Sequence, residues 1–243
     1  MNRLISAGLA FAFGLMIHDS RGIQAGSASC ILLGETLIYS AEDEAADCMA
    51  TLSRHDPNET NELSRACQLG AIRNLARVGS ADCIARLSQI WKANGDYAGC
   101  EAHDASLKIA ARLNLTNELM SIALDVATNG TPYLVMSENR RESLSRNHLY
   151  KTLLGIYCRG VSDDGQTASD DVKNAILAFL YDRIEMESGK DALYLDIQLS
   201  SAIPSYRHSQ RRRDRLLNVR NGISDSAMLR LIDRLQRIAS QED

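Results

Sequence analysis

Amphipathic segments separated by short polar breaks recur along almost the whole chain. Within a segment, apolar residues return every three or four positions, which is the period of an α-helix. The breaks contain Gly, Pro, Asn and Asp, residues that end helices and form turns. Aromatic residues make up only 5% of the sequence, and no run combines strand alternation with turn chemistry. We therefore predict an all-α fold with helices over 41–54, 58–78, 81–93, 97–113, 117–127, 140–158, 171–187, 191–203, 207–220 and 225–239.

Each predicted helix has one apolar face, which is expected to pack against its neighbours. The face of residues 81–93 contains Ile84, Leu87, Ile90 and Trp91. The face of residues 58–78 is expected to contain Leu63, Ala66, Cys67, Gly70, Ala71, Asn74, Leu75 and Val78.

Two stretches of the sequence correspond to each other at an offset of 35 residues. "GAIRNLARVGSADCIARLSQ" (70–89) aligns with "ASLKIAARLNLTNELMSIAL" (105–124), and "RLLNVRNGISDSAMLRLIDRL" (215–235) is similar to both. Each stretch contains two amphipathic helices and a short turn. This pattern resembles HEAT-like or armadillo-type α-solenoid repeats over residues 58–128 and, more loosely, 150–238. The Asp and Arg ladder usual in HEAT repeats is irregular here, and the Pro found in many of their first helices is missing.

The resemblance implies a right-handed superhelix of antiparallel helix pairs with an extended concave face. It also implies a protein that binds other proteins and has no catalytic centre. A single irregular helical bundle is the alternative fold.

The first 30 residues have the pattern of an export signal. Arg3 precedes fourteen uncharged residues, 4–17, a length typical of the apolar region of a signal peptide and too short to span a bilayer. Small side chains suited to signal peptidase follow, and cleavage is expected between residues 25 and 28. We therefore expect a signal peptide over 1–25, a single all-helical repeat domain over 30–243, and a periplasmic or secreted protein. A buried N-terminal helix is the alternative.

Six cysteines in an exported chain indicate disulfide bonds. Six thiols allow fifteen pairings, and helix geometry favours one bond. If residues 42–54 and 58–78 form a hairpin that turns near Pro57, Cys48 and Cys67 stand at nearly the same level. We predict a Cys48–Cys67 disulfide, with buried free thiols as the alternative.

No catalytic motif is present in the sequence. It lacks G-x-S-x-G, H-E-x-x-H and the phosphate-binding G-x-x-x-x-G-K-[ST]. Cys100 and His103 have the spacing of two zinc ligands, but no second ligand pair follows. We predict no catalytic residue, no cofactor and no metal. The alternatives are an envelope hydrolase that uses Glu or Asp carboxylates, and a cytosolic adaptor with free thiols.

The strongest local charge lies in residues 207–220, "RHSQRRRDRLLNVR". This segment contains six arginines and one aspartate, and Leu216, Leu217 and Val219 are expected to point inward. In a continuous helix, Arg207, Arg211 and Arg215 form one stripe, which suits an acidic partner. The candidate partner-binding residues are Arg207, Arg211, Arg212 and Arg215.

The function we expect is that of an exported, non-catalytic scaffold or adaptor that binds another protein or macromolecule. Anionic lipid headgroups are an alternative ligand. The net charge of −4 argues against nucleic acid. The alternative for the arginines is an exposed helix face that pairs with acids such as Asp225 and Asp233.

Overall fold

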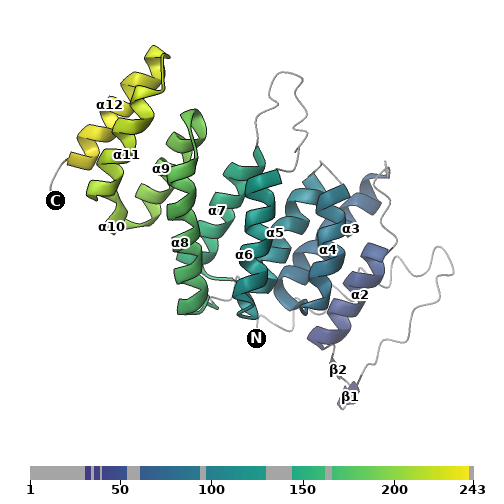
Figure 1. The fold of residues 1–243 in the computed structure, drawn as a ribbon. Coiled ribbons are helices and arrows are strands. Elements are labelled where there is room, and N and C mark those ends of the chain that lie inside the picture. The colour runs from purple at the N-terminus through teal and green to yellow at the C-terminus, as the bar shows by residue number, and fades with distance from the viewer. Residues whose placement is uncertain are drawn as a thin grey trace.

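The computed structural model describes residues 31–33, 36–38, 40–53, 61–93, 97–129, 144–161 and 166–240, and the predicted signal peptide lies outside this part of the chain. The described part contains eleven helices and one short hairpin, so the predicted all-α class is confirmed. Figure 1 shows the helices in an extended row, with α2 and α12 at opposite ends. The elements are β1 (Ile31–Leu33), β2 (Thr36–Ile38), α2 (Ala41–Ser53), α3 (Glu62–Val78), α4 (Asp82–Ala93), α5 (Tyr97–Arg112), α6 (Thr116–Asn129), α7 (Leu144–Arg159), α8 (Asp170–Met186), α9 (Gly189–Ala202), α10 (Pro204–Arg207), α11 (Gln210–Asn221) and α12 (Ser226–Ser240).

Polar side chains begin several of these helices by accepting hydrogen bonds from backbone N–H groups that have no partner inside the helix. Asn61 Oδ1 accepts from the N–H groups of Leu63 and Ser64 at 2.9 and 3.3 Å at the start of α3. At the start of α2, the Ser40 hydroxyl accepts from the Asp43 N–H at 3.1 Å, and the Asp43 carboxylate accepts from the Ser40 N–H at 3.3 Å. This reciprocal pair is a capping box, and it fixes where α2 begins.

The turn between α3 and α4 requires a residue without a side chain. Gly79 follows α3, and a Cβ at this position would lie 2.7 Å from the Leu75 carbonyl oxygen and 3.0 Å from Ile109 Cδ1. Glycine therefore lets α3 end while α5 packs closely against the turn. Helix α3 ends at Val78, as predicted from the sequence.

Contacts between helices run mainly to near neighbours in the chain. Helix α3 packs on α5, α5 on α7, α7 on α9 and α9 on α11, so these helices form one layer. The intervening helices pack against this layer: α4 on α5, α6 on α5 and α7, α8 on α7 and α9, and α12 on α11. The hydrophobic interior is therefore built between consecutive helices along the row (Figure 1).

The described helices enclose two separate clusters of buried apolar side chains. The larger one, called the first core below, runs from α2 through α8 and includes Leu195 and Leu199 of α9 and Tyr206 of α10. The smaller one, called the second core, contains Ala192, Leu193, Leu216, Val219, Ile232, Leu235 and Ala239 of α9, α11 and α12. Helix α9 thus contributes to both cores. In the described part of the chain, no helix has the length and apolar composition needed to cross a bilayer.

The short β-hairpin was not expected from the sequence. Strand β1 pairs with β2 in antiparallel register, with Ile31 opposite Ile38 and Leu33 opposite Thr36. The signal is present in "ILLGETLI", where two runs rich in β-branched and aliphatic residues flank a two-residue Gly-Glu connection. Each strand has only three residues, which is too short to show a clear strand alternation in the sequence.

Candidate functional site

The arginine-rich segment does not form the single helix expected over residues 207–220. Arg207 is the last residue of α10, and α11 begins at Gln210. Ser209 separates the two helices: its hydroxyl donates to the Tyr206 carbonyl at 2.8 Å and accepts from the Arg212 N–H at 3.2 Å. The predicted stripe of Arg207, Arg211 and Arg215 is therefore interrupted, because the serine caps a new helix between its first two members.

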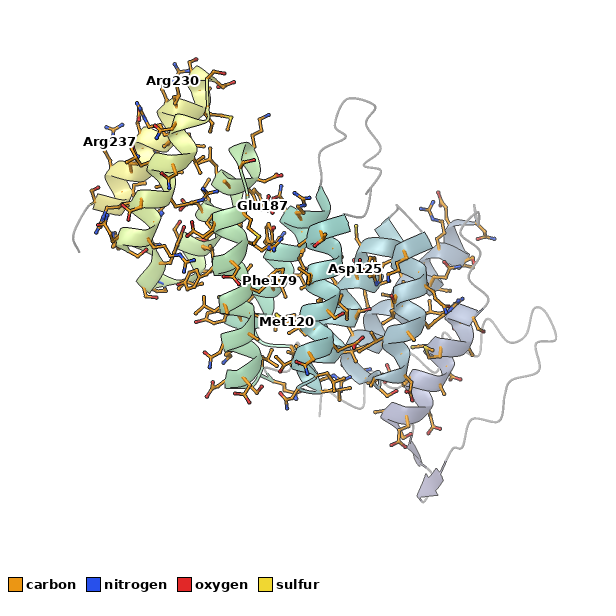
Figure 2. The ribbon with its side chains drawn as sticks, viewed as in Figure 1. Met120, Asp125, Phe179, Glu187, Arg230 and Arg237 are labelled. Atoms are coloured by element: carbon orange, nitrogen blue, oxygen red, sulfur yellow. The ribbon has the colours of Figure 1, made fainter. Side chains whose placement is uncertain are left out.

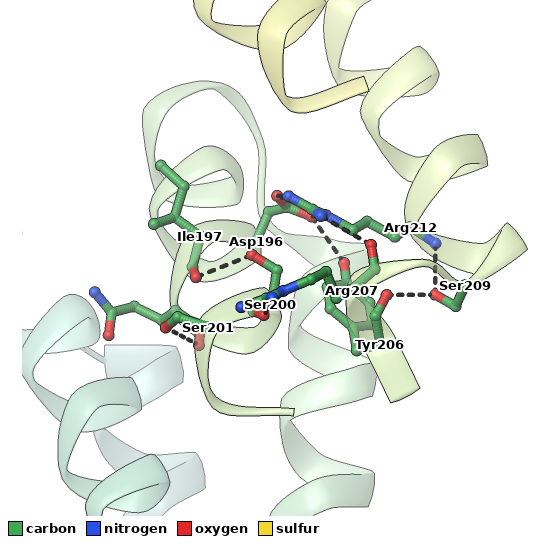
Figure 3. Close-up of polar contacts among 9 residues, drawn as sticks. Asp196, Ile197, Ser200, Ser201, Tyr206, Arg207, Ser209 and Arg212 are labelled. Atoms are coloured by element: carbon green, nitrogen blue, oxygen red, sulfur yellow. Dashed lines mark hydrogen bonds and ion pairs between the residues drawn. The ribbon is translucent and has the colours of Figure 1, made fainter. Parts of the chain in front are cut away.

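Arg212 is buried in an ion pair, which corrects its assignment as a partner contact. The Arg212 and Asp196 side chains are both 1% exposed, and the pair joins α11 to α9. Two guanidinium nitrogens hold the carboxylate: Nη2 donates to Oδ2 at 2.9 Å, and Nε donates to Oδ1 at 3.0 Å. Figure 3 shows this contact beside Tyr206 and Ser209. A side chain enclosed in this way is not accessible to another macromolecule.

Tyr206 completes the buried polar network. Its hydroxyl donates to Asp196 Oδ1 at 3.1 Å, and Arg212 Nη1 donates to the Arg207 carbonyl at 2.9 Å (Figure 3). Burial, reinforced by the negative charge of Asp196, raises the pKa of Tyr206. The tyrosine therefore keeps its proton and remains a hydrogen-bond donor to the carboxylate.

Arg207, Arg211 and Arg215 also bind groups of their own chain. Arg211 is exposed and joins α11 to the end of α8: its Nε lies 2.9 Å from Glu185 Oε1, and its guanidinium lies 4.7 Å above the ring of Tyr181. Arg215 donates to the backbone carbonyl of Glu187. Arg207 Nε donates to the Ser200 carbonyl at 3.1 Å. These arginines attach α10 and α11 to α8 and α9, and only Arg207 and Arg211 remain exposed.

The last helix, α12, carries a second set of arginines that the sequence analysis missed. Arg230, Arg234 and Arg237 are exposed, and their i, i+4, i+7 spacing places them on one side of the helix. Figure 2 shows Arg230 and Arg237 projecting outward at the end of the row. Within the described residues, none of the three forms a salt bridge with a carboxylate, although Arg237 Nε donates to the Asp233 carbonyl at 3.3 Å.

Two exposed apolar side chains accompany these arginines. Leu231 and Ile238 are 38% and 36% exposed, and their i, i+7 spacing places them on the same side of α12. The opposite side of the helix, with Ile232, Leu235 and Ala239, is buried in the second core. We call the outward side, formed by Arg230, Leu231, Arg234, Arg237 and Ile238, the α12 surface.

Charge is distributed unevenly along the chain. Residues 207–240 contain nine arginines and three aspartates, a net charge of +6. Residues 1–206 contain eighteen basic and twenty-six acidic residues, a net charge of −8. The α12 surface therefore lies at the positive end of an otherwise acidic molecule, which favours approach of a negatively charged partner to this end.

A polar cluster joins α5 to α7 near the middle of the row. His148 Nε2 lies 2.9 Å from Asp104 Oδ2, and the Thr152 hydroxyl donates to Asp104 Oδ1 at 2.7 Å. In a nucleophile–histidine–acid triad the histidine lies between the other two groups. Here the aspartate is central, and the threonine hydroxyl donates to it instead of to the histidine. The arrangement therefore suits a structural link between helices and does not activate Thr152.

The charges of this cluster reinforce each other. Burial alone would raise the pKa of Asp104, but the nearby imidazoles of His103 and His148 and the hydroxyl of Thr152 hold it below its usual value. The hydrogen bond to Asp104 raises the pKa of His148 above its usual value, against the effect of burial. His103 itself is fully buried, with its Nδ1 3.7 Å from Asp104 Oδ1, which is too long for a hydrogen bond.

The predicted Cys48–Cys67 disulfide is absent from the structure. None of the five cysteines in the described part of the chain forms a disulfide bond, and Cys48 is buried while Cys67 is exposed. Burial and the Glu44 carboxylate raise the pKa of Cys48 to about 11, so its thiol stays protonated and unreactive. Cys48 points into the first core while Cys67 lies on the solvent side of α3, so equal height along the two helices does not bring the sulfurs together.

Comparison with known proteins gives no match for this chain among protein-family models, curated proteins or solved structures. Among the described residues, no group of three or more His, Cys, Asp or Glu side chains is positioned to hold a metal ion. The functional assignment therefore depends on the chain's own surface and contacts.

Proposed function

We propose that this chain is a non-catalytic helical-repeat scaffold or adaptor that binds an acidic protein through the α12 surface. The observation that carries the proposal is the set of three exposed arginines, Arg230, Arg234 and Arg237, that form no salt bridge within the described residues. The other arginines of this region attach α10 and α11 to neighbouring helices, so they are engaged within the chain. The α12 arginines are on the surface and available.

The order of helix contacts supports a HEAT-like arrangement. Each helix contacts helices one or two places away in the chain, with α3, α5, α7, α9 and α11 in one layer and the remaining helices packed against it. Stacked helix pairs of a solenoid have this relation, and the 35-residue correspondence between 70–89 and 105–124 falls on α3–α4 and α5–α6. In this proposal the row of helix pairs is a rigid support that presents its terminal helix.

The chemistry of the α12 surface supports an acidic protein as the partner. Guanidinium groups bind carboxylates in a planar, bidentate geometry, and they combine this with apolar contact. Leu231 and Ile238 lie beside the arginines and would give a partner apolar area to bury. Exposed Arg207 at the end of α10 and Arg211 at the start of α11 would contribute at the edge of the same positive region.

Export is part of the same proposal and is supported by the sequence alone. The uncharged residues 4–17, followed by small residues up to 28, have the pattern of a signal peptide, and they lie outside the described residues. The partner is then expected in the cell envelope or outside the cell. Intact mass of the protein from its native host tests export: loss of the first 25 to 28 residues supports it, and a full-length mass contradicts it.

The binding proposal is tested by comparing two triple variants of the full chain. The test variant is Arg230→Ala, Arg234→Ala and Arg237→Ala, and the matched control is Arg65→Ala, Lys151→Ala and Arg159→Ala. Both lose three exposed positive charges, but the control charges lie on α3 and α7. Proteins retained from the native host by wild type and control, and lost by the test variant, are the candidate partners.

Affinity for the purified candidate decides the question. The test variant is expected to bind about 30-fold more weakly at low salt and only a few-fold more weakly at high salt, because exposed charges are screened. Equal affinity of test and control variants would contradict the proposal. A different outcome would be that no protein partner is found, and that the wild-type chain binds vesicles containing anionic lipid while the test variant does not. This would assign the α12 surface to membrane binding and overturn the protein-binding function.

A further inference from the structure

Three arginines from α7, α8 and α11 lie near Glu187, and one of them contacts its carboxylate. Glu187 follows α8 directly and is 7% exposed. Arg146 of α7 approaches its Oε2 with Nη1 at 3.6 Å, Arg215 of α11 donates to its backbone carbonyl, and Arg183 of α8 lies one turn before it. Glu187 is labelled in Figure 2 and lies directly after the last residue of α8. We call these four residues the Glu187 cluster.

The carboxylate of this cluster has a fixed neutral neighbour. The hydroxyl of fully buried Tyr150 donates a hydrogen bond to Glu187 Oε1. Burial, together with Glu187, raises the pKa of Tyr150, so the tyrosine holds its proton in this contact. The positive charges of Arg183 and Arg146 act in the opposite direction and lower the pKa of the same hydroxyl by a smaller amount. Tyr150 therefore adds no charge, and the cluster combines three guanidinium groups with one carboxylate.

The guanidinium groups are not satisfied by this single carboxylate. The Nε atoms of Arg183 and Arg215 are shielded from solvent and have no hydrogen-bond partner in the described part of the protein. Arg183 instead lies over the ring of Phe179, with its guanidinium carbon 5.5 Å from the ring centre. Shielded, unpaired donors on charged groups are costly, and a bound anion relieves that cost.

We propose that the Glu187 cluster binds the phosphate group of a small phosphorylated ligand or of inorganic phosphate. Three positive charges and one negative charge leave +2, which a phosphate dianion neutralises and a carboxylate does not. Guanidinium forks match phosphate oxygens in geometry, and Arg146, Arg183 and Arg215 would bring such forks from three separate helices. Such a ligand would also join α7, α8 and α11, the helices on either side of the boundary between the two cores. This site is distinct from the α12 surface and does not depend on it.

The first experiment measures binding of inorganic phosphate to the full-length chain by calorimetry at about pH 8, where the dianion predominates. We expect saturable binding with one site, and a rise in melting temperature with phosphate that sodium chloride of equal ionic strength does not produce. Glycerol 3-phosphate is the second probe, because tighter binding of the ester identifies a phosphorylated organic ligand. Acetate is the third, and we expect no saturable binding of this monoanion.

Substitutions at the cluster and at a matched position separate binding from general charge effects. Arg146→Gln is the main variant because the Arg146 side chain is 34% exposed and its loss is tolerated best by the fold. We expect phosphate affinity to fall about tenfold, the effect of removing one charged hydrogen-bond partner. The control is Arg220→Gln, an exposed arginine of α11 that pairs with Asp233 at 3.1 Å. Its phosphate affinity should stay unchanged.

Glu187→Gln provides an opposite prediction. The amide oxygen still accepts from Tyr150, while the local charge rises to +3, so phosphate affinity should increase several-fold. A purely structural role of the cluster would not increase affinity in this variant. The proposal is overturned by any of three results: no saturable phosphate binding up to about 10 mM, acetate binding as tight as phosphate, or equal losses in Arg146→Gln and Arg220→Gln.

Discussion

The two hydrophobic cores achieve stability in different ways. The first core is large, and its interior is lined mainly by aliphatic residues and alanines of the nine helices from α2 to α10, so these helices are held by apolar burial. The second core has seven buried apolar residues and lies between α9, α11 and α12. It is bordered by the buried Asp196–Arg212 pair and by arginines that donate to backbone carbonyls. We therefore expect the stability of the second core to fall more when a member of the buried ion pair is removed than when a methyl group is removed.

The largest loss of folding stability is expected from substitution of Arg212. Arg212→Ala leaves the Asp196 carboxylate buried without its positive partner, and breaking a buried ion pair in this way costs about 3 to 5 kcal/mol. Because the pair joins α9 to α11, the loss should fall on α11 and α12. Amide hydrogen exchange would show reduced protection in those helices and unchanged protection in α3 to α7.

A double variant tests the reason for this effect. Asp196→Asn combined with Arg212→Gln removes both charges and should be less destabilising than Arg212→Ala alone, because no uncompensated charge is left buried. Equal protection of α11 and α12 in wild type and Arg212→Ala would show that the second core does not depend on the pair.

The next largest loss of stability is expected from substitutions that create a cavity in one core or the other. Leu107 of α5 and Ile232 of α12 are both 0% exposed. Each change to alanine should cost about 3 kcal/mol by lost burial and the cavity left behind. The two variants should differ in how much of the protein is destabilised. Leu107→Ala should lower the denaturation midpoint of the first core, while Ile232→Ala should destabilise α12 alone. Denaturation monitored by Trp91 of α4, which is buried in the first core, distinguishes them.

If Ile232→Ala lowers the Trp91 midpoint as much as Leu107→Ala does, the two cores unfold as one unit. The two cores would then be separate clusters of side chains that unfold in a single cooperative step.

A smaller effect is expected from pH at the link between α5 and α7, which lies in the first core. Asp104 has a lowered pKa, so its contribution is present above its usual value near 4 and is lost as pH falls through its folded value. His148 has a raised pKa, so its contribution is complete below about 6.5 and is lost as pH rises through its folded value. The pair therefore stabilises the link between α5 and α7 most between about pH 4 and 6.5.

The size of this contribution is limited by solvent. With the His148 side chain 35% exposed, we expect about 1 kcal/mol after allowance for screening. His148→Gln should abolish the loss of stability between pH 6 and 9, measured by urea denaturation across about that range. An unchanged pH profile in the variant would assign the wild-type dependence to other groups.

Helix positions followed well from the sequence, but rotation about the helix axis did not. The predicted face of residues 81–93 is the buried one, with Ile84, Leu87, Ile90 and Trp91 inside. In α3 the buried residues are Gln68, Ala71, Ile72 and Leu75, while Leu63 and Cys67 are exposed. Ala71 and Leu75 lie on both the expected and the observed face, but the expected face followed small residues and left out Ile72, so the observed face is turned toward Gln68 and Ile72. That rotation explains why Cys67 points away from Cys48.

The functional residues show the same limit. The density of arginines in 207–220 was visible, but the Ser209 cap that divides the segment has no signal beyond a single residue type. Leu217 was expected inside and is 52% exposed, while Leu216 and Val219 are buried as expected, because the packing of α11 against α9 and α12 sets which face is inside. The spacing of Arg230, Arg234 and Arg237 was readable in "RLIDRLQR" and was overlooked because the neighbouring cluster is denser. Pairing of Arg212 with Asp196, sixteen residues away, depends on how α9 and α11 pack.

The smallest effect is expected at Arg220, and it sharpens the contrast with Arg212. Both arginines lie on α11 and pair with an aspartate at about 3 Å, but the Arg220 and Asp233 side chains are 44% and 46% exposed. Water solvates each partner when the other is removed, so Arg220→Ala should cost at most about 0.5 kcal/mol by urea denaturation. The same residue type on the same helix would thus differ about tenfold in its contribution, through burial alone. A cost of Arg220→Ala close to that of Arg212→Ala would mean instead that the α11–α12 contact is held by exposed pairs.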